Sequence, residues 1–168
     1  MIPKTILTGV CCCALASFTG VAQASNLSSA DKQFVRMAAE ANMTEANMAQ
    51  MAEKDATKQD VKDYARKLEQ DHSQAYSDLL DLSQKIGQPI PRGINIRRNA
   101  SATQLMHMKG DGFDRAYVKD EIQDHEKAVA MFQREADHGT DPDVKAYATK
   151  VLPTLHEHLE KAKELAGK

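Results

Sequence analysis

Four apolar stripes, each with alternating spacings of three and four residues, are interrupted near the middle by one polar residue: Glu45, His72, His125 and His158. A polar side chain in the core of a helix bundle costs free energy unless it finds a partner. Four such side chains that converge on one level would form either a hydrogen-bonded plug or a metal site. Three imidazoles and one carboxylate suit zinc or copper at least as well as iron.

Further carboxylates lie one helical turn from two of these histidines. Glu69-x-x-His72 has the spacing of the motif used by di-iron carboxylate bundles, and Glu121 precedes His125 by one turn. Leu155 stands where a second motif of this kind would need a glutamate before His158. The chain therefore matches the di-iron pattern only in part, and Glu69 and Glu121 are added as candidate ligands.

The elements that must position these residues are helices. The apolar periodicity predicts four of them, over about 30–55, 58–86, 112–138 and 142–166. Capping and stop signals flank these segments: Ser28 or Ser29, Gly87, Gly139, and Asp141 followed by Pro142. Counted from helical turns near residues 57 and 140, the four polar seam residues fall within roughly 10 Å of axial height, so one shared layer is expected.

A displacement of 83 residues brings the two halves of the chain into register. Asp31 then meets Asp114, Thr57 meets Thr140, and the segment 60–67 meets 143–150 with Asp-Val-Lys-x-Tyr-Ala-x-Lys in both. Such a match predicts a duplicated helical hairpin. The hairpins would span about 30–86 and about 112–166.

The connection over 87–111 is too long for a simple turn. It contains Pro89, Pro91 and Gly93, and a helix of 28 residues spans about 42 Å, which about 15 extended residues can cover. The segment therefore suits a crossover along the side of the bundle, with a short helix over 102–108. The predicted fold is an all-α, ferritin-like four-helix bundle made of two duplicated antiparallel hairpins joined by a long crossover.

The first 24 residues are typical of a secretory signal peptide. Lys4 precedes an apolar run over 6–21, and Ala22-Gln23-Ala24 forms the cleavage motif. All three cysteines of the chain lie in this segment, so residues 25–168, a single predicted domain, have no thiolate ligand. No other segment is apolar over the 18 residues of a spanning helix. We expect a periplasmic or outer-membrane-associated protein.

The chain resembles a family of bacterial exported proteins, domain of unknown function 4142, some of which are labelled predicted outer membrane proteins. The residues that carry the resemblance are Asp31-x-x-Phe34, Glu45, Asp71-His72, Phe113-Asp114-x-x-Tyr117, Asp124-His125 and Leu152-Pro153-x-Leu155-x-x-His158-Leu159. The resemblance implies a signal peptide and a ferritin-like bundle over about 30–165. It implies no established activity, so no catalytic residue is carried over.

Composition and motifs exclude several classes of function. Residues 25–168 hold 21 basic and 24 acidic side chains, without the basic excess of nucleic-acid-binding proteins. The sequence has no Gly-rich phosphate loop and no nucleophile elbow. We expect a non-enzymatic, envelope-associated or stress-related binding protein. Arg92, Arg97 and Arg98 are candidates for contact with an anionic envelope surface, although three exposed arginines usually mark only a soluble loop. The alternative is a metal-binding or metal-oxidising bundle centred on the Glu/His layer, with zinc, copper or iron.

Overall fold

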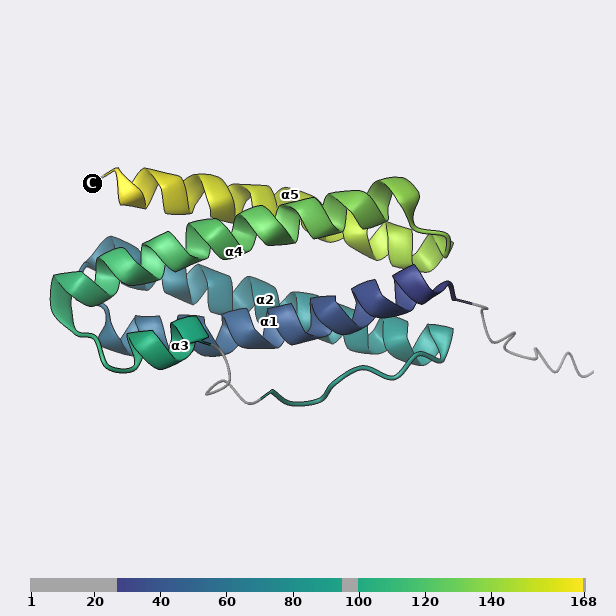
Figure 1. Cartoon of the computed structure of the whole chain (residues 1–168), viewed down its shortest axis with the longest axis horizontal. Coiled ribbons are helices and arrows are strands. Elements are labelled where there is room, and N and C mark those ends of the chain that lie inside the picture. The colour runs from purple at the N-terminus through teal and green to yellow at the C-terminus, as the bar shows by residue number, and fades with distance from the viewer. Residues whose placement is uncertain (1–26, 95–99, 168) are drawn as a thin grey trace, which may run out of the picture.

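The computed structural model describes residues 27–94 and 100–167. The predicted signal peptide and two of the three arginines of the connection, Arg97 and Arg98, lie outside these ranges. The described residues form five helices and no strand (Figure 1): α1 Ser29–Asp55, α2 Gln59–Ile86, α3 Ala100–Leu105, α4 Gly110–His138 and α5 Pro142–Ala166. None of these helices is long and apolar enough to cross a membrane.

The helix ends follow the signals in the sequence. Ser28 caps α1 in a capping box with Asp31, and Gly87 ends α2 in the left-handed conformation at φ 68°. The Asp141 side chain accepts hydrogen bonds from the backbone of Asp143 and Val144, and Pro142 occupies the first turn of α5. The predicted short helix is present as α3, but it begins at residue 100 and ends at Leu105.

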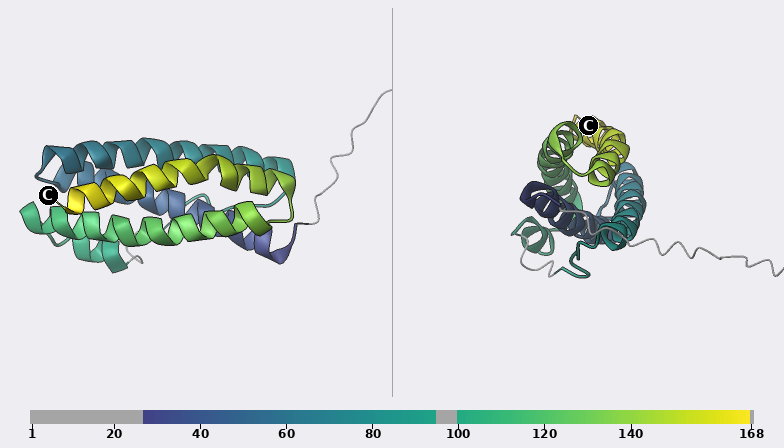
Figure 2. Two further views of the ribbon diagram at one scale, coloured as in Figure 1. Left: turned by 90° about the horizontal axis from the view of Figure 1, so that it is seen from above. Right: turned by 90° about the vertical axis from the view of Figure 1, so that its right-hand side faces the viewer.

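The four long helices form a bundle of two antiparallel hairpins. Helices α1 and α2 pair with each other, as do α4 and α5, and the hairpins meet where α2 packs on α5 and α1 packs on α4. Residues 87–94 run back along the bundle, and α4 starts at the end where α2 starts (Figure 1). The end-on view shows the two hairpins packed side by side (Figure 2). The predicted bundle with one long crossover is confirmed.

Two aspartates related by the 83-residue displacement make the same contact in the two halves. Asp31 at the start of α1 accepts hydrogen bonds from the backbone N–H groups of Thr140 and Asp141, in the turn of the other hairpin. Asp114 at the start of α4 accepts hydrogen bonds from the backbone of Thr57 and Lys58, at 2.9 and 2.8 Å. Each hairpin therefore supplies acceptors for the two backbone N–H groups just before the second helix of the other.

A polar layer divides the apolar core into two clusters. One cluster includes Met48, Leu68 and Tyr117, and the other includes Phe34 and Phe132. Between them lie the buried polar residues of the middle of the bundle: Asn42, Glu45, His72, Glu121, His125 and His158. The bundle buries these six groups at one level, as the sequence predicted for four of them.

The buried face of α4 differs from the predicted seam. Ile122, Val129 and Ala136 are only partly buried, whereas Glu121 and Glu135 are buried. The helix is turned so that the row Phe113, Tyr117, Glu121 and His125, at intervals of four residues, faces the core. Apolar periodicity missed this orientation because two members of the buried face are glutamates.

Candidate metal centre

Three histidines from three helices converge in the middle of the core. His72 on α2, His125 on α4 and His158 on α5 are 5%, 1% and 3% exposed. Each offers one ring nitrogen, and these three nitrogens lie within 4.8 Å of one another. The ring centroids are 5.2 to 5.5 Å apart. We call this set the imidazole cluster.

The tautomer of His125 follows from its backbone contact. Its Nδ1 lies 2.9 Å from the carbonyl oxygen of Glu121, one turn earlier on α4. A carbonyl oxygen can only accept a hydrogen bond, so Nδ1 carries the hydrogen of the neutral ring. The lone pair of His125 is therefore on Nε2, which faces the other two histidines.

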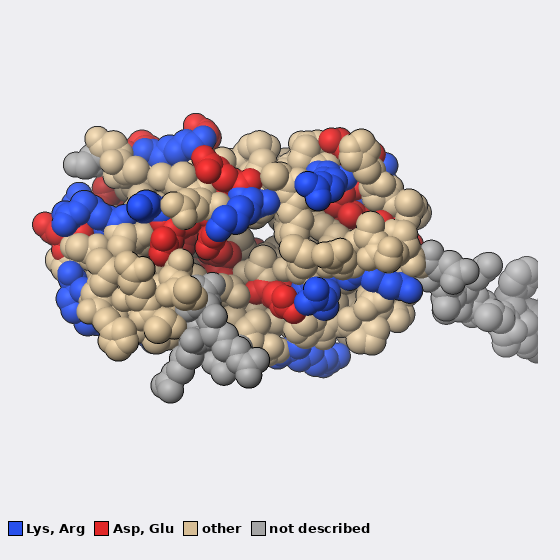
Figure 3. Space-filling model, in the orientation of Figure 1, with Lys and Arg blue, Asp and Glu red and all other residues tan. Residues whose placement is uncertain are grey.

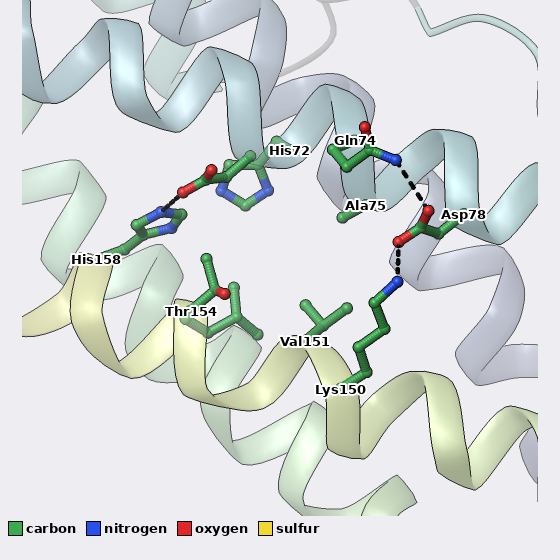
Figure 4. A pocket seen from close by; sticks show the side chains of 10 residues that line it. His72, Gln74, Ala75, Asp78, Lys150, Val151, Thr154 and His158 are labelled. Atoms are coloured by element: carbon green, nitrogen blue, oxygen red, sulfur yellow. Dashed lines mark hydrogen bonds and ion pairs between the residues drawn. The ribbon is translucent and has the colours of Figure 1, made fainter.

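His158 has the opposite tautomer to His125, with its hydrogen on Nε2. Its Nε2 lies 2.8 Å from Oδ2 of Asp71 on α2 (Figure 4). Burial acts to raise the pKa of Asp71, but hydrogen bonds from Lys67 and His158 outweigh burial, and the net pKa is lowered. The ionised carboxylate can only accept, so Nε2 of His158 donates and its lone pair is on Nδ1.

A chain of hydrogen bonds through Tyr147 and Asn42 fixes the tautomer of His72. The Tyr147 hydroxyl donates to the carbonyl oxygen of Ala75, so its oxygen accepts from the side-chain amide of Asn42. The Asn42 Oδ1 then accepts from Nδ1 of His72 at 2.9 Å. The lone pair of His72 is consequently on Nε2, which is buried and has no hydrogen-bond partner.

The three assignments leave one lone pair on each ring and no N–H donor among these three nitrogens. The Nε2 of His125 and the Nδ1 of His158 are 3.2 Å apart. This distance is close to the separation of about 3.3 Å between two nitrogens that bind one tetrahedral metal ion at about 2.0–2.1 Å. Burial lowers the pKa of His158 to about 4 and that of His72 well below its ordinary value, which disfavours a shared proton. The remaining N–H groups make the outer contacts that metal-binding histidines usually make.

Two buried glutamates lie beside the imidazole cluster. Oε2 of Glu45 lacks a hydrogen-bond partner, and Oε2 of Glu121 lies 3.3 Å from Nδ1 of His125. The two side chains form a second possible metal-binding group with His125. Burial raises the pKa of Glu121 to about 8, and burial together with Glu121 raises the pKa of Glu45 well above its usual value. The raised pKa of Glu121 favours its protonated form near neutral pH, and a nearby cation would favour ionisation of both carboxyl groups.

The predicted site residues separate into two groups. Glu45, Glu121, His72, His125 and His158 come together in the buried layer. Glu69 lies apart from it, because its carboxylate accepts hydrogen bonds from Gln50 and Ser73 at the surface. The remaining histidines of the chain are exposed, as expected of helix and loop surfaces: His107, His138 and His156.

Sequence reasoning missed the two side chains that orient the histidines, Asn42 and Asp71. The 83-residue repeat carries a signal for Asn42, because it pairs with His125 in that alignment. Asp71 lies between the seam residues Leu68 and Ala75, directly before His72. Its charge alone gives no reason to expect a contact with α5.

Cavities reach the imidazole cluster from opposite sides. A cavity of about 350 Å³ between α1 and α4 is lined in part by Glu45, His72 and His125. Figure 3 shows this face hollowed in the middle, with Asp and Glu side chains gathered around the hollow. A cavity of about 140 Å³ between α2 and α5 is lined in part by His72 and His158 (Figure 4).

The family assignment rests on the sequence of almost the whole chain. Residues 16–165 match the model of the domain of unknown function DUF4142. The chain belongs to the DUF4142 family. This assignment confirms the resemblance noted in the sequence, and the family name carries no activity.

The DUF4142 bundle is similar to a solved structure. A crystal structure of a DUF305 fragment from Deinococcus radiodurans superposes with a TM-score of 0.73 and 17% sequence identity. The match covers 84% of this chain and 97% of the fragment. At this identity the likeness supports the fold alone. None of the curated proteins compared with this chain matches it.

Proposed function

We propose that this DUF4142 protein binds one divalent transition-metal ion through His72, His125 and His158. The observation that carries the proposal is the convergence of three imidazole lone pairs whose N–H groups are already bonded elsewhere. A hydrogen-bonded plug, the competing explanation, leaves Nε2 of His72 buried without a partner. Buried polar groups without partners are rare in folded proteins.

The donor set favours some metals over others. Three neutral imidazoles form a nitrogen-rich site of the kind used by zinc and copper, and both metals accept a further oxygen ligand. Glu45 and Glu121 supply nearby carboxylates that can balance the charge of the ion. A carboxylate-rich di-iron centre fits less well, because Leu155 replaces one glutamate of the motif and Glu69 lies at the surface.

A binding role outside the cytoplasm is part of the proposal. The signal peptide over residues 1–24 and the periplasmic or outer-membrane location are predictions from the sequence. In that setting a buried histidine site would sequester or deliver a metal ion. We place metal binding ahead of association with an envelope surface, because the close approach of three buried imidazoles supports the former, whereas only Arg92 of the three arginines lies among the described residues.

The proposal is tested by elemental mass spectrometry of the untagged chain, exported by its own leader and purified without chelators. We expect about one zinc or copper ion per chain in the wild-type protein, and loss of most of it in His72→Ala and His158→Ala. His156→Ala is the matched control, because His156 is on the same helix and exposed. Wild-type protein that stays metal-free, and also fails to bind added zinc or copper, would contradict the proposal.

A further inference from the structure

The cavity between α1 and α4 has the properties of a small-molecule site. Its volume of about 350 Å³ lies at the low end of the range for ligand pockets, about 300–1,000 Å³, which are mostly apolar with a few placed polar groups. Much of its wall is apolar: Ala41, Ala128, Met131, Phe132 and Leu155. The cavity therefore accommodates a compact apolar body.

Two buried polar atoms of the cavity lining have no partner. These atoms are Nε2 of His72 and Oε2 of Glu45, in side chains that are 5% and 8% exposed as whole residues. A buried polar atom left unpaired is costly, so a ligand that supplies the missing partners gains affinity from both. The lone pair on Nε2 of His72 needs a hydrogen-bond donor or a metal ion, and Oε2 of Glu45 can accept a hydrogen bond from a ligand.

The proposed metal ion would leave room for a further ligand. Zinc held by three protein ligands keeps a fourth position for water or an added molecule. Since His72 and His125 line the cavity, a molecule inside it lies next to the imidazole cluster. The ion and the cavity can therefore act on the same ligand.

The charged side chains of the cavity rim are already paired. Glu40 pairs with Arg36 at 2.9 Å, and Asp124 pairs with Lys127 at 2.7 Å, so the lining offers an anionic ligand no free lysine. A neutral ligand leaves these ion pairs intact and avoids the cost of burying a charge.

We propose that this cavity binds a small neutral molecule with three features. These are a lone-pair donor atom for the metal, an N–H or O–H group for Glu45, and a compact apolar body for the wall formed by Ala128, Met131 and Phe132. The inference rests on the proposed metal binding and adds the class of ligand that reaches the ion. Imidazole combines the three features and serves as the probe.

The test uses the chain loaded with Co²⁺, whose visible absorption reports the coordination of a site that takes zinc. We expect imidazole to change the cobalt spectrum saturably in the wild-type protein, while cobalt stays bound after gel filtration. Ala128→Phe and the milder Ala41→Leu fill the cavity without removing a candidate ligand. Each should retain the cobalt spectrum and weaken the imidazole response by about tenfold or more.

Thr154→Leu is the matched control, because it fills the cavity on the opposite side between α2 and α5. Its imidazole response should stay within about twofold of wild type. A cobalt-loaded protein that does not respond to imidazole, or responds equally in the cavity-filling variants, would overturn the inference and leave metal binding standing. A wild-type chain that binds no cobalt would overturn the proposed metal site itself.

Discussion

The Nε2 atom of His125 and the Nδ1 atom of His158 face each other at 3.2 Å, and both carry a lone pair in the neutral rings. This relationship is set from outside the pair, by the Glu121 carbonyl oxygen on one side and the Asp71 carboxylate on the other. Two facing lone pairs repel each other unless a cation lies between them. The bundle therefore holds two imidazoles in the arrangement that a bound metal ion would stabilise.

Removal of Asp71 should weaken metal binding without removing a ligand. In Asp71→Ala, His158 loses the acceptor that keeps its Nδ1 free, so the affinity for zinc should fall by about 10–100-fold, as is common for outer-sphere partners. Isothermal titration calorimetry on metal-free protein measures the change. Asp78→Ala is the control, because Asp78 is also on α2 but pairs with Lys150. Equal affinities in the two variants would contradict the assigned role of Asp71.

Asn42 should matter for both stability and metal binding. Asn42→Ala leaves the Nδ1–H of His72 without its acceptor and removes the donor to Tyr147, so we expect a loss of about 1–3 kcal/mol in the free energy of unfolding. Tyr147→Phe breaks the same chain one step further from His72. Urea denaturation should show a smaller loss of stability for Tyr147→Phe than for Asn42→Ala. Zinc affinity should fall only in Asn42→Ala, in which the Nδ1–H group of His72 loses its acceptor. A normal zinc affinity in Asn42→Ala would count against the relay.

Much of the fold was predictable, because each long helix has an apolar seam and a capping or stop residue at one end at least: Ser28, Gly87, Gly139 and Asp141. The α4 seam was misplaced since buried Glu121 and Glu135 look like surface residues when only apolar periodicity is considered. The imidazole cluster was predictable because its histidines interrupt apolar seams. Asn42 and Asp71 were missed because their contacts depend on how α1, α2, α4 and α5 are placed across the core, which periodicity along one helix does not encode.

The pair of repeat-related aspartates should stabilise the bundle from both ends. Asp114→Ala leaves the backbone N–H groups of Thr57 and Lys58 without acceptors, and should cost about 1–3 kcal/mol. The exposed Asp111, in the first turn of the same helix, provides the control substitution Asp111→Ala. Thermal and urea unfolding should separate the two variants clearly. Equal stabilities would mean that solvent replaces the Asp114 contacts at no cost.

Glu135 should make the stability of the protein depend on pH. Burial, followed by the neighbouring Asp31, raises the pKa of Glu135 to about 7 from an ordinary value of 4.5. The folded state therefore holds a proton that the unfolded state releases between these values, and stability from this group is full below pH 4.5 and lost as pH rises through about 7. Glu135→Gln mimics the protonated form and should gain stability relative to wild type over that range. Urea unfolding at several pH values measures the difference, and a constant difference would refute the assignment.

The central claim is that one ring nitrogen from each of three buried histidines binds a metal ion. ¹⁵N NMR of the histidine side chains during a zinc titration of the metal-free chain tests this claim most directly. Before zinc is added, we expect His72 and His125 to carry their hydrogen on Nδ1 and His158 on Nε2. At one equivalent of zinc, Nε2 of His72, Nε2 of His125 and Nδ1 of His158 should shift together, while the exposed His107, His138 and His156 stay unchanged. Zinc-induced shifts confined to the exposed histidines, or the opposite tautomers in the buried three, would contradict the account.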